Sequence, residues 1–262
     1  VLLKGIPASY QRDLQEDKPR LFDALATLES CLRVLAGMIA TRARAEGGGA
    51  GDVLLVAQKV VSKAEGRTVA LAAVEVDRAA AALAEETGKD PALCALILAE
   101  SRRIVRQRGG TVIGETHPGF VCANAGIDAS NTPEGTVILL PRDPDASARR
   151  IQAAVAAAVG GRVGVVVTDT HGRAFRRGLV NVATGVAGFA PVSDHRGRRD
   201  RGGRTLVATD EAIADELAAA AGPFMGKDAG TPVVVVSGVP TDPAPGGAGE
   251  LVRAPEHDLF RT

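Results

Sequence analysis

The chain has 262 residues, of which 45% are hydrophobic and 24% charged, a composition ordinary for a globular protein with a large core. Lysine plus arginine and aspartate plus glutamate both number 31, and aromatic residues make up only 3%, which argues against nucleic acid as a partner. No apolar stretch reaches the roughly 18 residues of a membrane span, so we expect no membrane partner. The three cysteines have no CxxC spacing and suit a reduced compartment, so we expect a cytoplasmic protein.

In the first part of the chain, apolar residues at helical spacing predict one or two helices over residues 20–45, which the glycine-rich stretch 46–52 ends. The continuous apolar run Val53–Val56 predicts a buried strand, and the polar run Gln58–Lys63 follows it. Asp90 and Pro91 predict a helix that begins there and continues to about Val105.

Further along, strands and helices alternate. The expected elements are strands at about 111–113, 119–123 and 136–140, an alanine-rich helix from Asp143 to about Val159, a buried strand Val163–Val167, a helix capped by Thr209–Glu211 and ending near Ala221, and a last strand Pro232–Val236. This order predicts an α/β or mixed α+β fold in which helices cover the faces of buried strands.

The run Asn124–Asn131 holds two amides, a carboxylate and a hydroxyl, and only Ile127 in it is suited to a core. An Asx-rich turn is one explanation, because Asn, Asp and Gly dominate ordinary turns. Two similar polar clusters, however, follow the strands that end near Val56 and Val167. Ligands bind at such strand ends in open sheets, so three clusters favour a functional site over three unrelated turns.

The residue types in these clusters are complementary. Asp128 and Asp169 are hard oxygen ligands for Mg²⁺ or Mn²⁺ and our candidate catalytic residues, and the hydroxyl of Thr170 adds a third ligand. Lys63 suits a phosphate. We expect the remaining polar side chains to contact the substrates, namely Ser62, Asn124, Arg173 and Arg176. The alternatives are that the aspartates cap helices and that the arginines form a solvated face.

Several common signatures are missing: the sequence has no P-loop, HExxH, GxSxG or GxGxxG motif. We expect His171 to have a structural or supporting role. The basic run 194–204 reads as a solvated loop or as a site for an acidic small molecule.

Five segments, taken together and in order, resemble the coenzyme F420-0:γ-glutamyl ligase family over residues 51 to about 240. The matching segments are Gln58–Arg67, Gly119–Asn131, Leu139–Ala148, Thr168–Arg173 and Met225–Lys227.

The resemblance implies a GTP-dependent ligase that adds L-glutamate to F420-0, and then to F420-1, through γ-linked amide bonds. It implies phosphorylation of the acceptor carboxylate, with release of GDP and phosphate, by an intertwined homodimer of two-subdomain chains that needs Mg²⁺ or Mn²⁺, often together with K⁺. Metal ligands would fall on Asp128, Asp169 and Thr170. Nucleotide contacts would fall on Lys63, Asn131 and a loop that contains Met225, Gly226, Lys227, Asp228, Ala229, Gly230 and Thr231.

We expect residues 1–262 to form one domain of this family. The chain also departs from the family pattern at several positions. Residues 1–50 diverge, and Lys227 stands where some members carry an acidic metal ligand, although Asp228 is adjacent. His171 stands where other residues are usual. A glutamate ligase with a different cofactor-precursor acceptor and a catalytically weakened nucleotide-binding homologue therefore remain alternatives.

Overall fold

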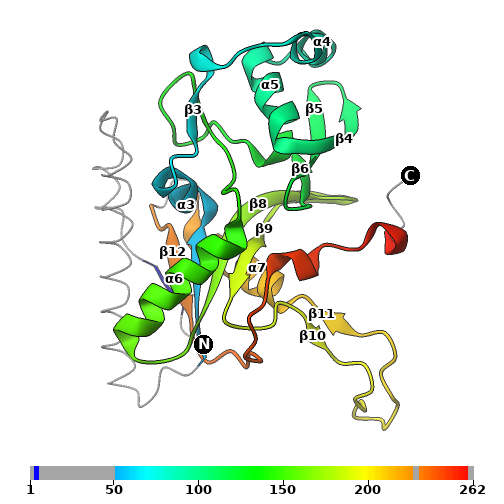
Figure 1. The fold of residues 1–262 in the computed structure, drawn as a ribbon. Coiled ribbons are helices and arrows are strands. Elements are labelled where there is room, and N and C mark those ends of the chain that lie inside the picture. Colours follow the sequence, from blue (N-terminus) through cyan, green and yellow to red (C-terminus); the bar gives the residue numbers. More distant parts are fainter. Residues whose placement is uncertain (1–2, 6–50, 227–229, 259–262) are drawn as a thin grey trace.

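The computed structural model describes residues 3–5, 51–226 and 230–258. Its centre is a mixed five-stranded sheet of strand order β1-β12-β2-β8-β9, in which only β2 and β8 are parallel (Figure 1). The strands are β1 (Leu3–Gly5), β12 (Val233–Val236), β2 (Asp52–Ala57), β8 (Val163–Arg173) and β9 (Arg176–Ala187). The expected mixed α/β fold class is thereby confirmed.

Helices cover both faces of this sheet. Helix α6 (Pro144–Val159) packs on one face with Leu54 and Val56, and α7 (Ile213–Met225) packs on the other with Val53 and Leu55. Successive strand residues point to opposite faces, so burial on both sides requires the continuous apolar run seen in the sequence.

A second, smaller body lies beside one end of the sheet, where the labels α4, α5 and β4–β6 gather in Figure 1. It contains α4 (Arg78–Thr87), α5 (Pro91–Glu100) and a three-stranded antiparallel sheet of β4 (Ser101–Arg108), β5 (Thr111–Thr116) and β6 (Val121–Ala123). The pair β3 (Thr68–Ala70) and β7 (Thr136–Ile138) connects it to the main sheet. It has its own core around Cys94, Ile97 and Val112, so the molecule has distinct apolar cores joined by short connections.

The best sequence predictions rest on clear start and stop signals. Helix α6 begins after Asp143, whose side chain accepts a hydrogen bond from the Ala146 N–H, and it ends at Gly160 in the left-handed conformation. Strands β2 and β12 also lie where their apolar runs predict them. Local chemistry decides these elements before any tertiary contact does.

Two predicted helix boundaries are wrong. The helix expected to continue to Val105 ends at Glu100, because Ser101–Arg108 pairs with β5 across the tight turn at Gly109. Thr209–Glu211 does not cap a helix: β11 (Asp210–Glu211) pairs with β10 (Ser193–Asp194), and α7 begins after it. In both cases strand pairing, a non-local contact, overrides the local helix signal.

The structure also contains elements that the sequence did not reveal. Gln58–Ala64, expected as a polar run, is the helix α3, and α4 and β9 were not expected. The helices expected over residues 20–45 lie outside the described residues. Among the described helices, none combines the length and the apolar character that crossing a bilayer requires.

Candidate functional site

A cavity of about 540 Å³ lies at the carboxyl end of β2, beside the continuation of β8. Four segments surround it: α3, the loop that follows β6, the β8–β9 hairpin, and the end of α7 with the chain leading into β12. Because Ala57, the last residue of β2, pairs with Thr168, the following residues of β8 extend past β2 and pair with β9 alone. Asp169 and Thr170 therefore stand at an open sheet end, where α/β proteins bind ligands.

Helix α3 contributes two lysines to the cavity. Lys59 and Lys63 are four residues apart, so they lie on one face of the helix. Lys63 Nζ donates a hydrogen bond of 2.9 Å to the Asn131 carbonyl oxygen. Partial burial, together with the nearby charge of Lys59, lowers the pKa of Lys63. These two ammonium groups make the side of the cavity formed by α3 suited to binding an anion.

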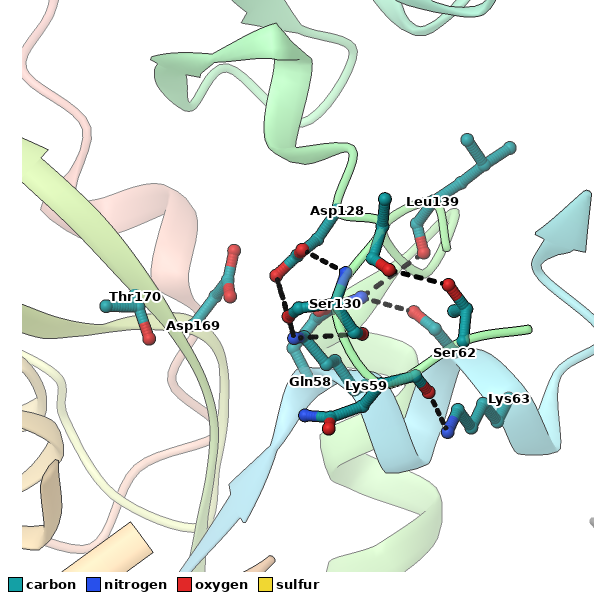
Figure 2. A network of polar contacts seen from close by, with 12 residues as sticks. Gln58, Lys59, Ser62, Lys63, Asp128, Ser130, Leu139, Asp169 and Thr170 are labelled. Atoms are coloured by element: carbon teal, nitrogen blue, oxygen red, sulfur yellow. Dashed lines mark hydrogen bonds and ion pairs between the residues drawn. The ribbon is translucent and has the colours of Figure 1, made fainter. Parts of the chain in front are cut away.

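Asp128 faces the same wall. Its Oδ2 lies 2.7 Å from Lys59 Nζ and accepts a 3.0 Å hydrogen bond from Ser130 Oγ, while its Oδ1 accepts a 2.7 Å bond from the Ser130 N–H (Figure 2). Lys59 also donates to Ser130 Oγ. Partial burial alone would raise the pKa of Asp128, but the hydrogen bonds from Lys59 and Ser130 and the Lys59 charge outweigh it, so the pKa is lowered. Asp128 is thus held as a carboxylate.

The loop that carries Asp128 has an unusual backbone. Asn124, Ala125 and Gly126 have φ values of 50°, 53° and 76°, so three consecutive residues are left-handed and turn the chain sharply after β6. Ile127 then anchors the loop in the core of the smaller body at 7% exposure. Asp128 follows, and its backbone pairs with Ile138 in both directions. The turn and the anchor together direct the Asp128 side chain to the cavity.

Asp169 and Thr170 come from β8, on the opposite side of the cavity from α3, and Figure 2 shows Asp128 pointing toward them. Thr170 Oγ1 donates a 3.2 Å hydrogen bond to Asn181 Oδ1 on β9, and Asn181 Nδ2 lies 3.6 Å from Met225 Sδ on α7. Asp169 Oδ2 lies 3.6 Å from His171 Nε2. The hairpin register therefore fixes Thr170 firmly, while Asp169 remains directed at the cavity with few partners.

The donor set fits a hard divalent cation. Within residues 3–5, 51–226 and 230–258, no three histidine, cysteine, aspartate or glutamate side chains gather to form an all-protein metal cage. Two carboxylates and a hydroxyl nevertheless line one cavity, and Asp128 already holds a cationic ammonium group. Mg²⁺ is commonly bound through one or two carboxylates and completes its shell with water and substrate phosphates, so a cage is not required.

Of the remaining residues predicted to contact the nucleotide, those that the structure describes line the same cavity. Asn131, Met225, Gly226, Gly230 and Thr231 all contribute to its surface. Lys227, Asp228 and Ala229 lie outside the described residues. The cavity therefore brings together segments that are about a hundred residues apart in the chain.

The four residues expected to contact substrates do not line this cavity. Ser62 is fully buried and accepts a hydrogen bond from Gln58, so it holds α3 internally. Asn124 lies in the left-handed turn. Arg173 and Arg176 are exposed at the far end of the β8–β9 hairpin. Their contact with substrates stays a prediction.

Sequence reasoning assigned no role to several residues that the structure places in the cavity, chiefly Lys59, Thr168 and Asn181. Lys59 had a usable signal, because its four-residue spacing from Lys63 puts both on one face if the run is helical. Asn181 had none, since only the register of β8 on β9 brings it beside Thr170.

Comparison with known proteins shows the family of this chain. The pattern of the family described as F420-0:Gamma-glutamyl ligase matches residues 33–238. The chain is similar to the protein named Coenzyme F420:L-glutamate ligase in three archaea. It is 47% identical to that of Methanothermobacter thermautotrophicus over 214 residues (80% of this chain, 85% of the relative). It is 46% identical to that of Methanopyrus kandleri over 232 residues (87% and 91%) and 47% identical to that of Halobacterium salinarum over 209 residues (77% and 79%).

The fold, the polar cavity and these relatives define an enzyme of the acid–amino-acid ligase class. The family match extends over more than half of the chain, and the relatives are similar over most of their length. The chain belongs to the F420-0:γ-glutamyl ligase family.

Proposed function

We propose that this protein adds L-glutamate to coenzyme F420-0, and in a further round to F420-1, at the expense of GTP. One observation carries the proposal: in a chain of this family, two lysines and two aspartates converge on a single cavity with the described residues on either side of 227–229, namely Met225, Gly226, Gly230 and Thr231. The α3 side of the cavity offers positive charge for phosphates, and a carboxylate on each side, Asp128 beside Lys59 and Asp169 on β8, is available for a divalent cation.

The reaction divides into two balanced steps. An oxygen of the acceptor carboxylate attacks the γ-phosphorus of GTP, and the bond from that phosphorus to the bridging oxygen breaks to release GDP. The amine of glutamate then attacks the acyl phosphate, loses a proton and displaces phosphate, which leaves an amide. Neither step needs a protein nucleophile, so positioning and charge stabilisation are the tasks left to the protein.

The described residues suit these tasks. Lys63 and Lys59 would hold the phosphate oxygens, and Asn131 with the Met225–Thr231 segment would hold the rest of the nucleotide. Asp128, Asp169 and Thr170 would bind Mg²⁺ or Mn²⁺, which when bound neutralises negative charge on the transferred phosphoryl group. The hydrogen bond from Thr170 to Asn181 keeps the hydroxyl oriented in advance. K⁺ is proposed as an additional cation on the family resemblance alone.

The test is incubation of the purified protein with F420-0, GTP, Mn²⁺ and L-glutamate, followed by mass spectrometry and a GDP assay. A product heavier by one glutamyl residue, with one GDP released per bond, is the expected result. GDP release with another precursor but not with F420-0 would favour a ligase with a different acceptor. GTP binding with neither GDP nor product would favour a weakened nucleotide-binding homologue.

We also propose that the protein works in the cytoplasm as a homodimer. The cysteines Cys94 and Cys122 are free and buried, which suits a reducing compartment. At the β8–β9 hairpin, Phe175 is 89% exposed and Leu179 is 59% exposed, and exposed large apolar side chains on a projecting element suit a protein interface. A second copy of this chain is the partner that the family resemblance implies.

A further inference from the structure

His171 is a largely buried histidine on the strand that carries Asp169 into the cavity. It lies on β8 two residues after Asp169, and its side chain is only 13% exposed. Its Nε2 atom is inaccessible to solvent and has no hydrogen-bond partner among the residues that the structure describes. Buried polar atoms in folded proteins are nearly always paired, so this nitrogen calls for an explanation.

The geometry around His171 supplies one. Residues two apart on a strand point to the same face, so the ring stands beside the Asp169 carboxylate. The separation of Nε2 from Asp169 Oδ2 is 3.6 Å, just beyond a hydrogen bond. Contacts of this kind are often long in a ligand-free protein and shorten when the ligand is bound. His171 does not line the cavity itself, whereas Asp169 does.

A second acidic side chain, on another element, is close enough to the histidine to interact with it electrostatically. Asp215 on α7 accepts a 2.8 Å hydrogen bond from the Ala183 N–H on β9. Burial raises the pKa of Asp215, and the hydrogen bond from the Ala183 N–H and the charge of the nearby His171 oppose that shift. The histidine therefore lies near carboxyl groups of two packed elements, β8 and α7.

We propose that His171 is a positioning residue: its Nε2–H closes onto Oδ2 of Asp169 and fixes that carboxylate for a divalent cation. The inference rests on the proposed metal-binding role of Asp169. Ligands of metal ions are commonly oriented by hydrogen bonds from residues behind them, and loss of such a bond typically weakens metal binding by about 10- to 100-fold. The proposal gives His171 a function that no side chain lacking an N–H donor at that position can perform.

The experiment measures Mn²⁺ binding to the full chain by electron paramagnetic resonance, with Mn²⁺ as the only ligand added. His171→Phe keeps a ring but removes the donor, and we expect its dissociation constant for Mn²⁺ to rise by about 10- to 100-fold. His171→Gln keeps an N–H donor at similar reach, and we expect it to restore binding to within about threefold of the original protein. His171→Ala repeats the loss without the bulk of the Phe ring if the Phe variant fails to fold.

His195→Gln is the matched control, because His195 contacts Ser193 and Glu211 away from the cavity, and its Mn²⁺ affinity should not change. Unchanged Mn²⁺ affinity in both His171→Phe and His171→Ala overturns the proposal. Equal loss in the Gln and Phe variants also overturns it, since packing would then explain both.

Asp169→Asn distinguishes failure of the metal role of Asp169 from failure of the positioning role of His171. If it binds Mn²⁺ as the original protein does, or if the original protein binds none, the metal role of Asp169 fails and the inference falls with it. If it binds weakly while His171→Phe does not, only the role of His171 fails.

Discussion

Lys59 Nζ lies 2.7 Å from Asp128 Oδ2, so the carboxylate proposed to bind a metal already holds a cation from α3. This contact joins the helix after β2 to the loop after β6, two segments that fold against different cores. It lowers the pKa of Asp128, and Figure 2 shows how it links α3 to the loop.

We expect Lys59→Met to destabilise the protein by about 1 kcal/mol at pH 7, because a charge-assisted hydrogen bond in a partly exposed site is lost. The difference should shrink with acid. The pKa of Asp128 in the folded protein lies below its ordinary value of 3.8, so its contribution is present above that value and is lost as pH falls through the lowered pKa. Urea unfolding between pH 7 and pH 3 measures both quantities.

Lys63→Met is the matched control for this prediction. It removes an ammonium group one turn further along α3, and Lys63 bonds to a backbone carbonyl instead of a carboxylate. Its stability difference from the original protein should not change between pH 5 and pH 3. A constant difference for Lys59→Met over the same range would show that its ion pair with Asp128 contributes nothing to folding.

Gly126→Ala should destabilise the protein by about 2 to 4 kcal/mol. Gly126 has a φ of 76°, and a Cβ atom added there would lie 2.6 Å from Leu140 Cδ1, so backbone strain and a packing clash add together. Gly135→Ala is the control, because its φ of 72° is nearly the same while nothing lies within 4 Å of the added atom. Thermal and urea unfolding of the two variants separate the clash from the strain. Equal losses would mean that Leu140 moves aside freely.

The packing that distinguishes Gly126 from Gly135 could not be predicted from the sequence. The run around Gly126 indicates a turn, and a turn favours glycine, but Leu140 approaches it only because β7 returns alongside the loop. In the same way, Asp143 and Gly160 predict α6 from adjacent residues, whereas the strand Ser101–Arg108 depends on pairing with β5. Asp128 and Asp169 could be predicted to line one cavity because each follows an apolar run in the sequence that predicts a strand. Lys59 and Asn181 could not, because helix formation by α3 and the β8–β9 register decide their positions.

The proposed homodimer leads to a prediction at the β8–β9 hairpin. Phe175→Asp should shift the protein from dimer to monomer in light scattering, since burying a Phe side chain contributes about 1.5 to 3 kcal/mol and a buried carboxylate opposes association. Val207→Asp is the control: Val207 is 82% exposed on the separate loop between β10 and β11, so the dimer should persist. A Phe175→Asp variant that remains dimeric at micromolar concentration would exclude this hairpin from the interface.

Asp128→Asn and Asp169→Asn should each reduce kcat/KM for ligation by at least about 100-fold, because each removes a negative charge that we propose binds the cation, a contribution of several kcal/mol. Both variants should fold. Asn at position 128 retains an oxygen for the Ser130 N–H, and the contact of the Asp169 side chain with His171 is long, at 3.6 Å. Asp194→Asn, which alters an exposed carboxylate paired with Arg196, should leave activity unchanged. Rates are followed by GDP release, and circular dichroism checks the fold. Near-original turnover in either cavity variant would remove that residue from the metal site.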